Sequence, residues 1–135
     1  MIKVARLALQ RGHVVKIFTL RWQAPPMPEF EVVELPIVGM NRHTQYENFA
    51  LAFNQAVQAE HFDLVVGFNK MPGLDVYYAG DSCFVEKAHT QRSAGYRLLP
   101  RYKSFHAAEQ AVYGAGSPTQ VLTISDNEVP RYRHY

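Results

Sequence analysis

Residues 64–79 contain an apolar run that is interrupted by a polar turn and then resumes. The stretch from Leu64 to Phe68 predicts a buried strand, and the stretch from Val76 to Ala79 predicts a second one. The turn between them begins with Asn69 and Lys70 and is punctuated by proline and glycine. Ligands of open α/β sheets bind outside the carboxyl ends of the strands, so this turn is the first candidate site.

Strand and helix patterns alternate along the rest of the chain. A helical pattern ends at Gly12, and strands are predicted at 14–19, 31–36 and 120–125, with helices from about 49 to 61 and from Pro100 onward. Ser125 or Asp126 is a candidate helix cap near the end. This alternation predicts an α/β fold with a Rossmann-like parallel sheet and right-handed crossovers. Such a sheet normally starts with a strand and a glycine-rich turn, which we expect to precede Met1.

Composition limits the class of protein. With 135 residues, 47% of them apolar, residues 1–135 can form one domain around one core. A net charge of +2 does not indicate a nucleic-acid partner, and the single cysteine, Cys83, excludes a disulfide within the chain. No apolar run approaches the about 20 residues that span a bilayer, and no signal-peptide pattern is present. We therefore expect a soluble or membrane-peripheral protein of a reducing compartment.

A basic and aromatic segment follows the second predicted strand. No acidic residue lies between Lys87 and Glu109. Cationic side chains alternate there with rings, a composition that suits an anionic membrane surface. An ordinary amphipathic helix, with its rings in the core and its charges in water, explains the pattern equally well. The candidate membrane-binding residues are Tyr96, Arg97, Arg101, Tyr102, Lys103 and Phe105.

Three groups of residues are candidates for chemistry. Lys70 beside Asn69 suits a phosphate ligand, although turns also use such residues for backbone reasons. Asp81 and His43 follow predicted strands and could serve as a general base or as ligands of a sugar hydroxyl, or merely as caps and surface residues. The six histidines show no close paired spacing, so no metal site is expected. Cys83 is expected to be a small buried apolar residue.

The segment that contains the candidate turn resembles a known family, the lipopolysaccharide glucosyltransferase I family. The run from Gly67 to Tyr77 reads GFNKMPGLDVY, and further agreement lies on both sides of it. The matching residues are Arg11-Gly12-His13, Phe18-Thr19, Trp22, Ala79, Asp81, Cys83, Lys87, Tyr96-Arg97 and Arg101-Tyr102-Lys103. The resemblance covers nearly the whole chain and corresponds to the N-terminal half of the family.

This resemblance implies a retaining glycosyltransferase of the GT-B fold, which moves glucose from UDP-glucose to a heptose of the lipopolysaccharide inner core. No metal is expected in that fold, in which basic side chains and helix N-termini would instead stabilise the diphosphate. Asp81 is then expected to be the catalytic-site carboxylate, with Asn69, Lys70 and His43 as substrate-binding residues. The basic aromatic segment is expected to bind the cytoplasmic face of the inner membrane.

The same resemblance shows which parts of the family pattern this chain does not contain. We expect the first strand with its glycine pair to lie before Met1, and the C-terminal domain that binds UDP-glucose to lie after Tyr135. Half of a cleft cannot align donor with acceptor, so we expect no transferase activity from this polypeptide alone. A non-catalytic module that binds lipopolysaccharide or a membrane surface is the alternative.

Overall fold

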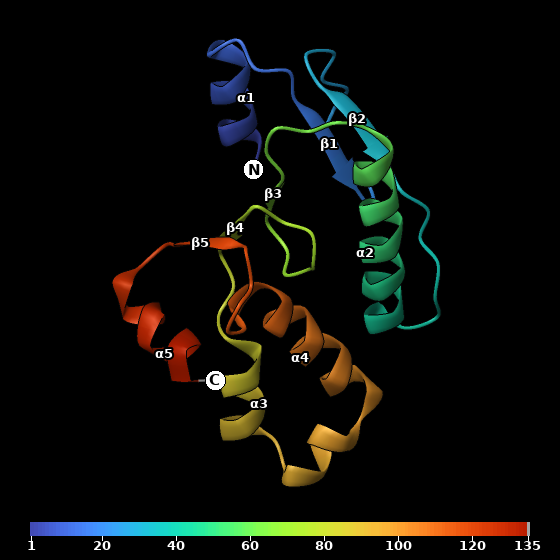
Figure 1. The fold of residues 1–135 in the computed structure, drawn as a ribbon. Helices are drawn as coiled ribbons and strands as arrows, with labels where there is room; N and C mark the ends of the chain where they lie inside the picture. Colours follow the sequence, from blue (N-terminus) through green and yellow to red (C-terminus); the bar gives the residue numbers. More distant parts are fainter. Residues whose placement is uncertain (135) are drawn as a thin grey trace.

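The computed structural model describes residues 1–134, and these residues form an α/β fold (Figure 1). The helices are α1 (Ile2–Gln10), α2 (Arg42–Ala59), α3 (Phe84–Gln91), α4 (Pro100–Tyr113) and α5 (Val129–His134), with 3₁₀ helices η1 (Ala94–Leu98) and η2 (Asp126–Glu128). The strands are β1 (Lys16–Thr19), β2 (Glu31–Glu34), β3 (Val66–Gly67), β4 (Val76–Ala79) and β5 (Gln120–Thr123).

All strand pairs in the described part of the chain are parallel, as the alternation of elements predicted. β1 pairs with β2, with Ile17 opposite Val32. The second sheet has the order β3-β4-β5, with Tyr77 opposite Val121. The parallel α/β class is therefore confirmed, although the ladders form two sheets rather than one.

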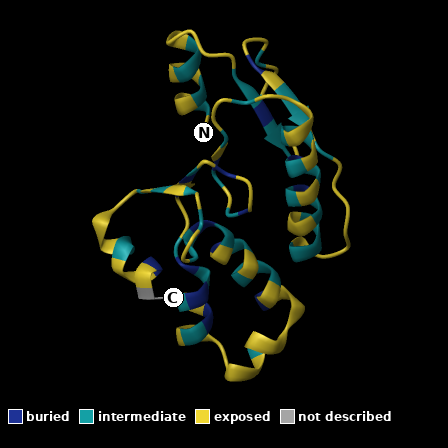
Figure 2. Ribbon diagram, viewed as in Figure 1, coloured by how far each residue is buried: buried dark blue, intermediate teal, exposed yellow. Residues whose placement is uncertain are grey.

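The main core lies where α2 and α4 pack against β4 and the turn before it. Tyr77 is fully buried and Val112 is 1% exposed. The buried cluster is formed by Phe49, Phe53, Met71, Leu74, Tyr77, Ala79 and Val112. Figure 2 shows that the inner faces of α2 and α4 are buried or intermediate while their outer faces are exposed. This core holds the turn after β3 between the two helices.

The prediction of a buried strand from Leu64 to Phe68 is wrong in extent and in burial. Only Val66 and Gly67 form ladder pairs, and Leu64 is 58% exposed. β3 pairs only with β4 among the described strands, which leaves its other edge open. Just before β3, the Val65 amide donates a hydrogen bond at 2.8 Å to the side-chain carboxylate of Asp75 and not to a backbone carbonyl of a neighbouring strand.

Helices begin earlier and occur more often than the sequence pattern indicated. α2 starts at Arg42, because Asn41 and Thr44 form a capping box at its N-terminus. Helices α3 and η1 were not predicted. α4 does begin at Pro100, whose missing amide proton costs nothing in the first turn. Ser125 caps η2 as expected by accepting a hydrogen bond from the Asn127 amide.

Candidate functional site

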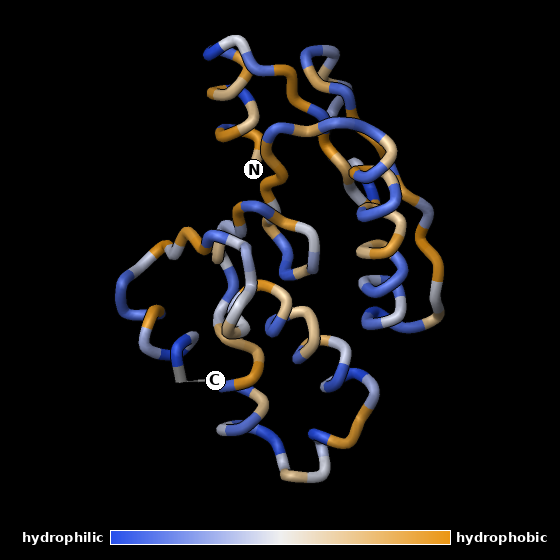
Figure 3. Tube along the Cα trace, in the orientation of Figure 1, coloured by the Kyte–Doolittle hydropathy of each residue, from blue (hydrophilic) through white to orange (hydrophobic). Residues whose placement is uncertain are grey.

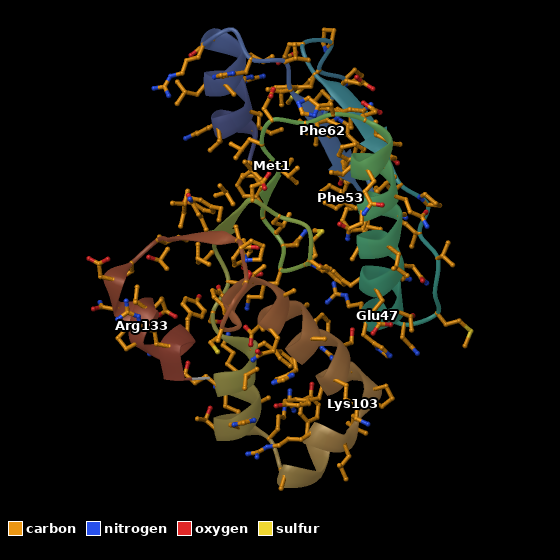
Figure 4. All side chains as sticks on the ribbon, viewed as in Figure 1. Met1, Glu47, Phe53, Phe62, Lys103 and Arg133 are labelled. Atoms are coloured by element: carbon orange, nitrogen blue, oxygen red, sulfur yellow. The ribbon has the colours of Figure 1, made fainter. Side chains whose placement is uncertain are left out.

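A cavity of about 860 Å³ lies between α2, α4 and the turns that follow β3 and β4. Side chains of α2 and α4 project into the space between the two helices, with Glu47 near the lower end of α2 (Figure 4). The polar lining residues are Tyr46, Glu47, Asn48, Asn54, Asn69, Lys70, Asp81, Ser82, Lys87 and Ser104. Rings and methyl groups, including those of Leu51, Met71, Phe84 and Phe105, form the rest of the wall.

Two neighbouring parallel strands bring three of the predicted residues to this cavity. Asn69 and Lys70 follow β3, while Asp81 follows β4. β3 and β4 are adjacent and parallel, so their carboxyl ends meet at one edge of the sheet. Pairing of the strands therefore juxtaposes residues that are separated by more than ten positions in the sequence.

Lys70 is largely buried and its charge is paired. Its ammonium donates hydrogen bonds to the Glu109 carboxylate on α4 and to the Ser82 carbonyl oxygen, the latter at 3.0 Å. The side chains of Lys70 and Glu109 are 11% and 4% exposed. The Lys70 ammonium also lies 5.6 Å from the centre of the Tyr113 ring, an additional favourable contact for a cation.

Glu109 also accepts hydrogen bonds from the start of α3. The backbone amides of Phe84 and Val85 lie 2.6 and 2.8 Å from its two carboxylate oxygens. These amides belong to the first turn of α3, where no intrahelical acceptor is available. The carboxylate thus supplies the acceptors that this helix end needs, and its negative charge suits the positive end of the helix dipole.

Asp81 has an exposed side chain on a turn whose backbone is fixed. Its carbonyl oxygen accepts a hydrogen bond from the Tyr132 hydroxyl at 2.5 Å. The next carbonyl, that of Ser82, is held by Lys70. The Asp81 carboxylate is therefore carried by a restrained backbone into a cavity that water and ligand can reach.

The mixture of groups in the cavity suits a polyhydroxylated ligand. Carboxylates accept hydrogen bonds from hydroxyl groups, while asparagine amides can both donate and accept them. Phe105 contacts Tyr46 at 5.9 Å and Phe84 at 5.2 Å between ring centroids, so an aromatic wall faces these polar groups. Concave sites with an apolar wall and a few converging polar groups are typical of small-molecule binding.

The structure does not bring His43 to this cavity. His43 lies in the first turn of α2 rather than after a strand, and it is not among the residues that line the cavity. The expected position of His43 directly after a strand is therefore wrong, and its role as a substrate-binding residue stays a prediction. The capping box at Asn41 is the cause, since it starts the helix before His43.

The basic aromatic segment divides into an inward face and an outward face. Tyr102 is only 9% exposed, and its hydroxyl lies 3.0 Å from Nε2 of His89. Phe105 is half-buried and lines the cavity. The inward position of Tyr102 is that of the amphipathic-helix alternative, and its contact with a membrane stays a prediction without support from its burial.

The outward face of the basic aromatic segment carries its cationic side chains. Arg97, Arg101 and Lys103 are exposed, and Leu98 between them is 75% exposed. Figure 3 shows an apolar stretch where η1 leads into α4. Arg101 lies over the Phe105 ring at 5.8 Å, while Tyr96 is half-buried under Arg92.

Residues 1–134 contain no cluster of three or more histidine, cysteine, aspartate or glutamate side chains arranged to hold a metal ion. Burial raises the pKa of the Cys83 thiol, whose sulfur accepts a hydrogen bond from the Glu86 amide. Cys83 is 2% exposed, which agrees with the predicted role as a small buried residue. No helix within residues 1–134 has the length and hydropathy to cross a membrane.

Glu109 was not predicted as a residue of this site. One signal was available, because Glu109 occurs at helical spacing with Tyr102, Phe105 and Val112, all of which are apolar or aromatic. A carboxylate on an otherwise apolar face of a helix is expected to meet a buried donor or cation. Its partner, Lys70, cannot be read from the sequence because 39 positions separate the two.

Comparisons with known proteins agree with the resemblance found in the sequence. The chain is 32% identical over 135 residues to the lipopolysaccharide glucosyltransferase WaaG of Escherichia coli strain K12. It also matches the crystal structure of WaaG, described as a glycosyltransferase involved in lipopolysaccharide biosynthesis, with a TM-score of 0.95 and 30% identity. Both matches cover 99% of this chain but only 36% of the relative. No protein-family model matches the chain.

Proposed function

This chain is a homologue of the N-terminal part of a lipopolysaccharide glucosyltransferase, and on that premise we propose that it is the acceptor-side portion of a glycosyltransferase. The reaction is transfer of glucose from UDP-glucose to a heptose of the lipopolysaccharide inner core, with retention of configuration. The supporting observation is a shared fold along 99% of the chain, with the cavity at the carboxyl edge of β3 and β4.

In this proposal the cavity binds the acceptor sugar. Asp81 accepts a hydrogen bond from an acceptor or transferred-sugar hydroxyl, and Asn69 orients a neighbouring hydroxyl. The rings of Tyr46, Phe84 and Phe105 cover the apolar face of the sugar. The reacting hydroxyl is thereby held in one orientation, which lowers the entropic part of the barrier.

Lys70 has a more limited role than a free lysine would have. Its charge is offset by Glu109, so the cavity gains less positive potential from it than the sequence suggested. An ammonium has three donors, and two of those of Lys70 are used in hydrogen bonds to Glu109 and Ser82. Contact between Lys70 and a phosphate of the core stays a prediction.

The outward face of the basic segment is proposed to bind the cytoplasmic face of an anionic inner membrane. Arg97, Arg101 and Lys103 attract acidic headgroups, at about 1 kcal/mol for each charge near the surface. Replacing all three by glutamate should abolish sedimentation with vesicles of phosphatidylglycerol and phosphatidylethanolamine at low salt. The control with the same change of net charge is Lys3→Glu/Arg11→Glu/Arg42→Glu, at exposed positions outside the segment. Equal binding by the two triple variants would remove the membrane proposal.

The donor site belongs to the remaining part of such an enzyme. UDP-glucose is proposed to bind a C-terminal domain, with basic side chains and helix N-termini, rather than a metal ion, stabilising the diphosphate. This chain by itself is then expected to bind acceptor without transferring glucose, because rate enhancement needs donor and acceptor aligned.

A binding module without catalysis is the second candidate. The observation that favours it is that the cavity and the exposed basic face both lie within this one chain. Under this alternative, lipopolysaccharide binds as before but no polypeptide that contains the chain transfers glucose. A glucose-transfer assay on the polypeptide that joins this chain to a nucleotide-binding domain separates the two candidates.

The acceptor role itself is tested by binding. Titration of the ¹⁵N-labelled chain with heptose should shift the amide resonances of Asn69 and Asp81, whereas sucrose should not. Asp81→Asn should weaken heptose binding about tenfold, as expected for loss of a hydrogen bond to a charged group. Asp63→Asn is the control, because Asp63 is fully exposed and does not line the cavity. Absence of heptose binding by the unaltered chain would overturn the acceptor role.

A further inference from the structure

Glu109 is the buried charged residue of the described chain, with 3% of its surface exposed. Its carboxylate meets donors from two other segments: the Lys70 ammonium, and the amides of Phe84 and Val85. Burial of a charge is unfavourable unless it is paired and hydrogen-bonded, and here both conditions are met. The carboxylate thus ties α4 to the turn after β3 and to the start of α3.

This network ends at the turn that carries Asp81. Lys70 holds the Ser82 carbonyl at 3.0 Å, and Tyr132 holds the Asp81 carbonyl at 2.5 Å. Two consecutive peptide groups are therefore fixed from different sides. The first group, between Asp81 and Ser82, adjoins the Cα of Asp81 and so limits the direction in which its side chain leaves the backbone. The second group lies one residue further along and fixes the turn that the first belongs to.

We propose that Glu109 is a positioning residue of the acceptor site, which acts through Lys70 and the Ser82 carbonyl to orient Asp81 toward the bound sugar. The inference rests on the proposed acceptor role of the cavity. Glu109 does not touch the sugar in this arrangement. It holds the turns after β3 and β4 in a fixed position relative to each other, so that Asn69 and Asp81 can bind the same ligand.

A purely structural role for Glu109 makes a different prediction. If the carboxylate only stabilises the start of α3, any variant that stays folded binds heptose normally. If Glu109 positions Asp81, binding weakens even when stability is kept. The two roles separate in a variant that removes the charge pair without leaving a buried charge.

The test uses the double variant Lys70→Met/Glu109→Gln. Glutamine retains an acceptor for one of the two α3 amides. Methionine fills the volume of lysine without a charge, so no buried charge is left unpaired and folding is expected to survive. The variant has no cation at the Ser82 carbonyl. Heptose affinity, measured by ¹⁵N titration, is expected to fall about tenfold. Asp81→Asn should then add little in this background, because Asp81 is already misplaced. Glu29→Gln, which alters an exposed pair with Arg6, is the control.

The folding and the heptose affinity of these variants decide whether Glu109 positions Asp81. A folded double variant that binds heptose as the unaltered chain does overturns the positioning role while leaving the acceptor site intact. If the double variant does not fold, Glu109→Asp keeps the charge but shortens the reach by one methylene, and unchanged affinity there overturns the role equally. If the unaltered chain binds no heptose, the acceptor role fails and the inference fails with it.

Discussion

Replacement of Glu109 by glutamine alone should destabilise the protein strongly. The change leaves the Lys70 ammonium, whose side chain is only 11% exposed, without its counter-charge. Breaking one partner of a buried ion pair costs about 3 kcal/mol or more. This is a large part of the about 5–15 kcal/mol by which domains are stable. A chain of this length has an unfolding entropy of about 0.28 kcal/mol/K, so the melting temperature should fall by about 10 °C.

Urea denaturation followed by circular dichroism measures this cost. The Lys70→Met/Glu109→Gln double variant should recover most of the lost free energy of unfolding, because it contains no unpaired buried charge. The coupling between the two positions, taken from the four-member cycle, should therefore be about 2 kcal/mol or more. Refutation would come from a Glu109→Gln variant that loses less than about 1 kcal/mol, the range of an exposed ion pair.

Three further predictions follow from particular contacts. Gly73→Ala should lower the free energy of unfolding by about 1–2 kcal/mol in urea titration, because φ is +83° there and an added Cβ meets the Asn54 side chain; equal stability would contradict the glycine requirement. The Cys83 thiol should resist iodoacetamide at pH 8 until urea exposes it, because burial raises its pKa and keeps it protonated; rapid native alkylation would disprove this. Burial also raises the pKa of Tyr77 above its usual 10.0, so unfolded chains lose this proton first and the free energy of unfolding should fall above pH 10. Tyr77→Phe should reduce that alkaline slope in part, because burial also raises the pKa of Tyr113 and of Tyr132; an unchanged slope would rule out a contribution from Tyr77.

Local patterns predicted much of the fold. Gly12 ends α1 with a positive φ of 86°, β4 spans the predicted residues 76–79, and α4 begins at Pro100. These features depend on neighbours within a few residues, which is why the sequence shows them. The short extent of β3 was not predictable, since it depends on which strands pair.

The candidate site was predicted in part, because the ends of strands and the turns after them also depend on nearby residues. The resemblance and the strand pattern placed Asn69, Lys70 and Asp81 at one edge of the sheet, and these residues do line one cavity. His43 was misplaced because a capping box moved the start of a helix. The burial of Tyr102 was not predictable, because the face of α4 that packs inward depends on which elements lie beside the helix.

The sequence by itself determined the parallel α/β class, the elements that glycine, proline and caps delimit, and the turn where the site begins. The tertiary structure alone decided that the Lys70 ammonium is paired with the Glu109 carboxylate. Hydrogen bonds and ion pairs between distant positions depend on how helices and strands pack, and no local pattern records that packing. The burial of Glu109 against the start of α3 is therefore a property of the folded chain.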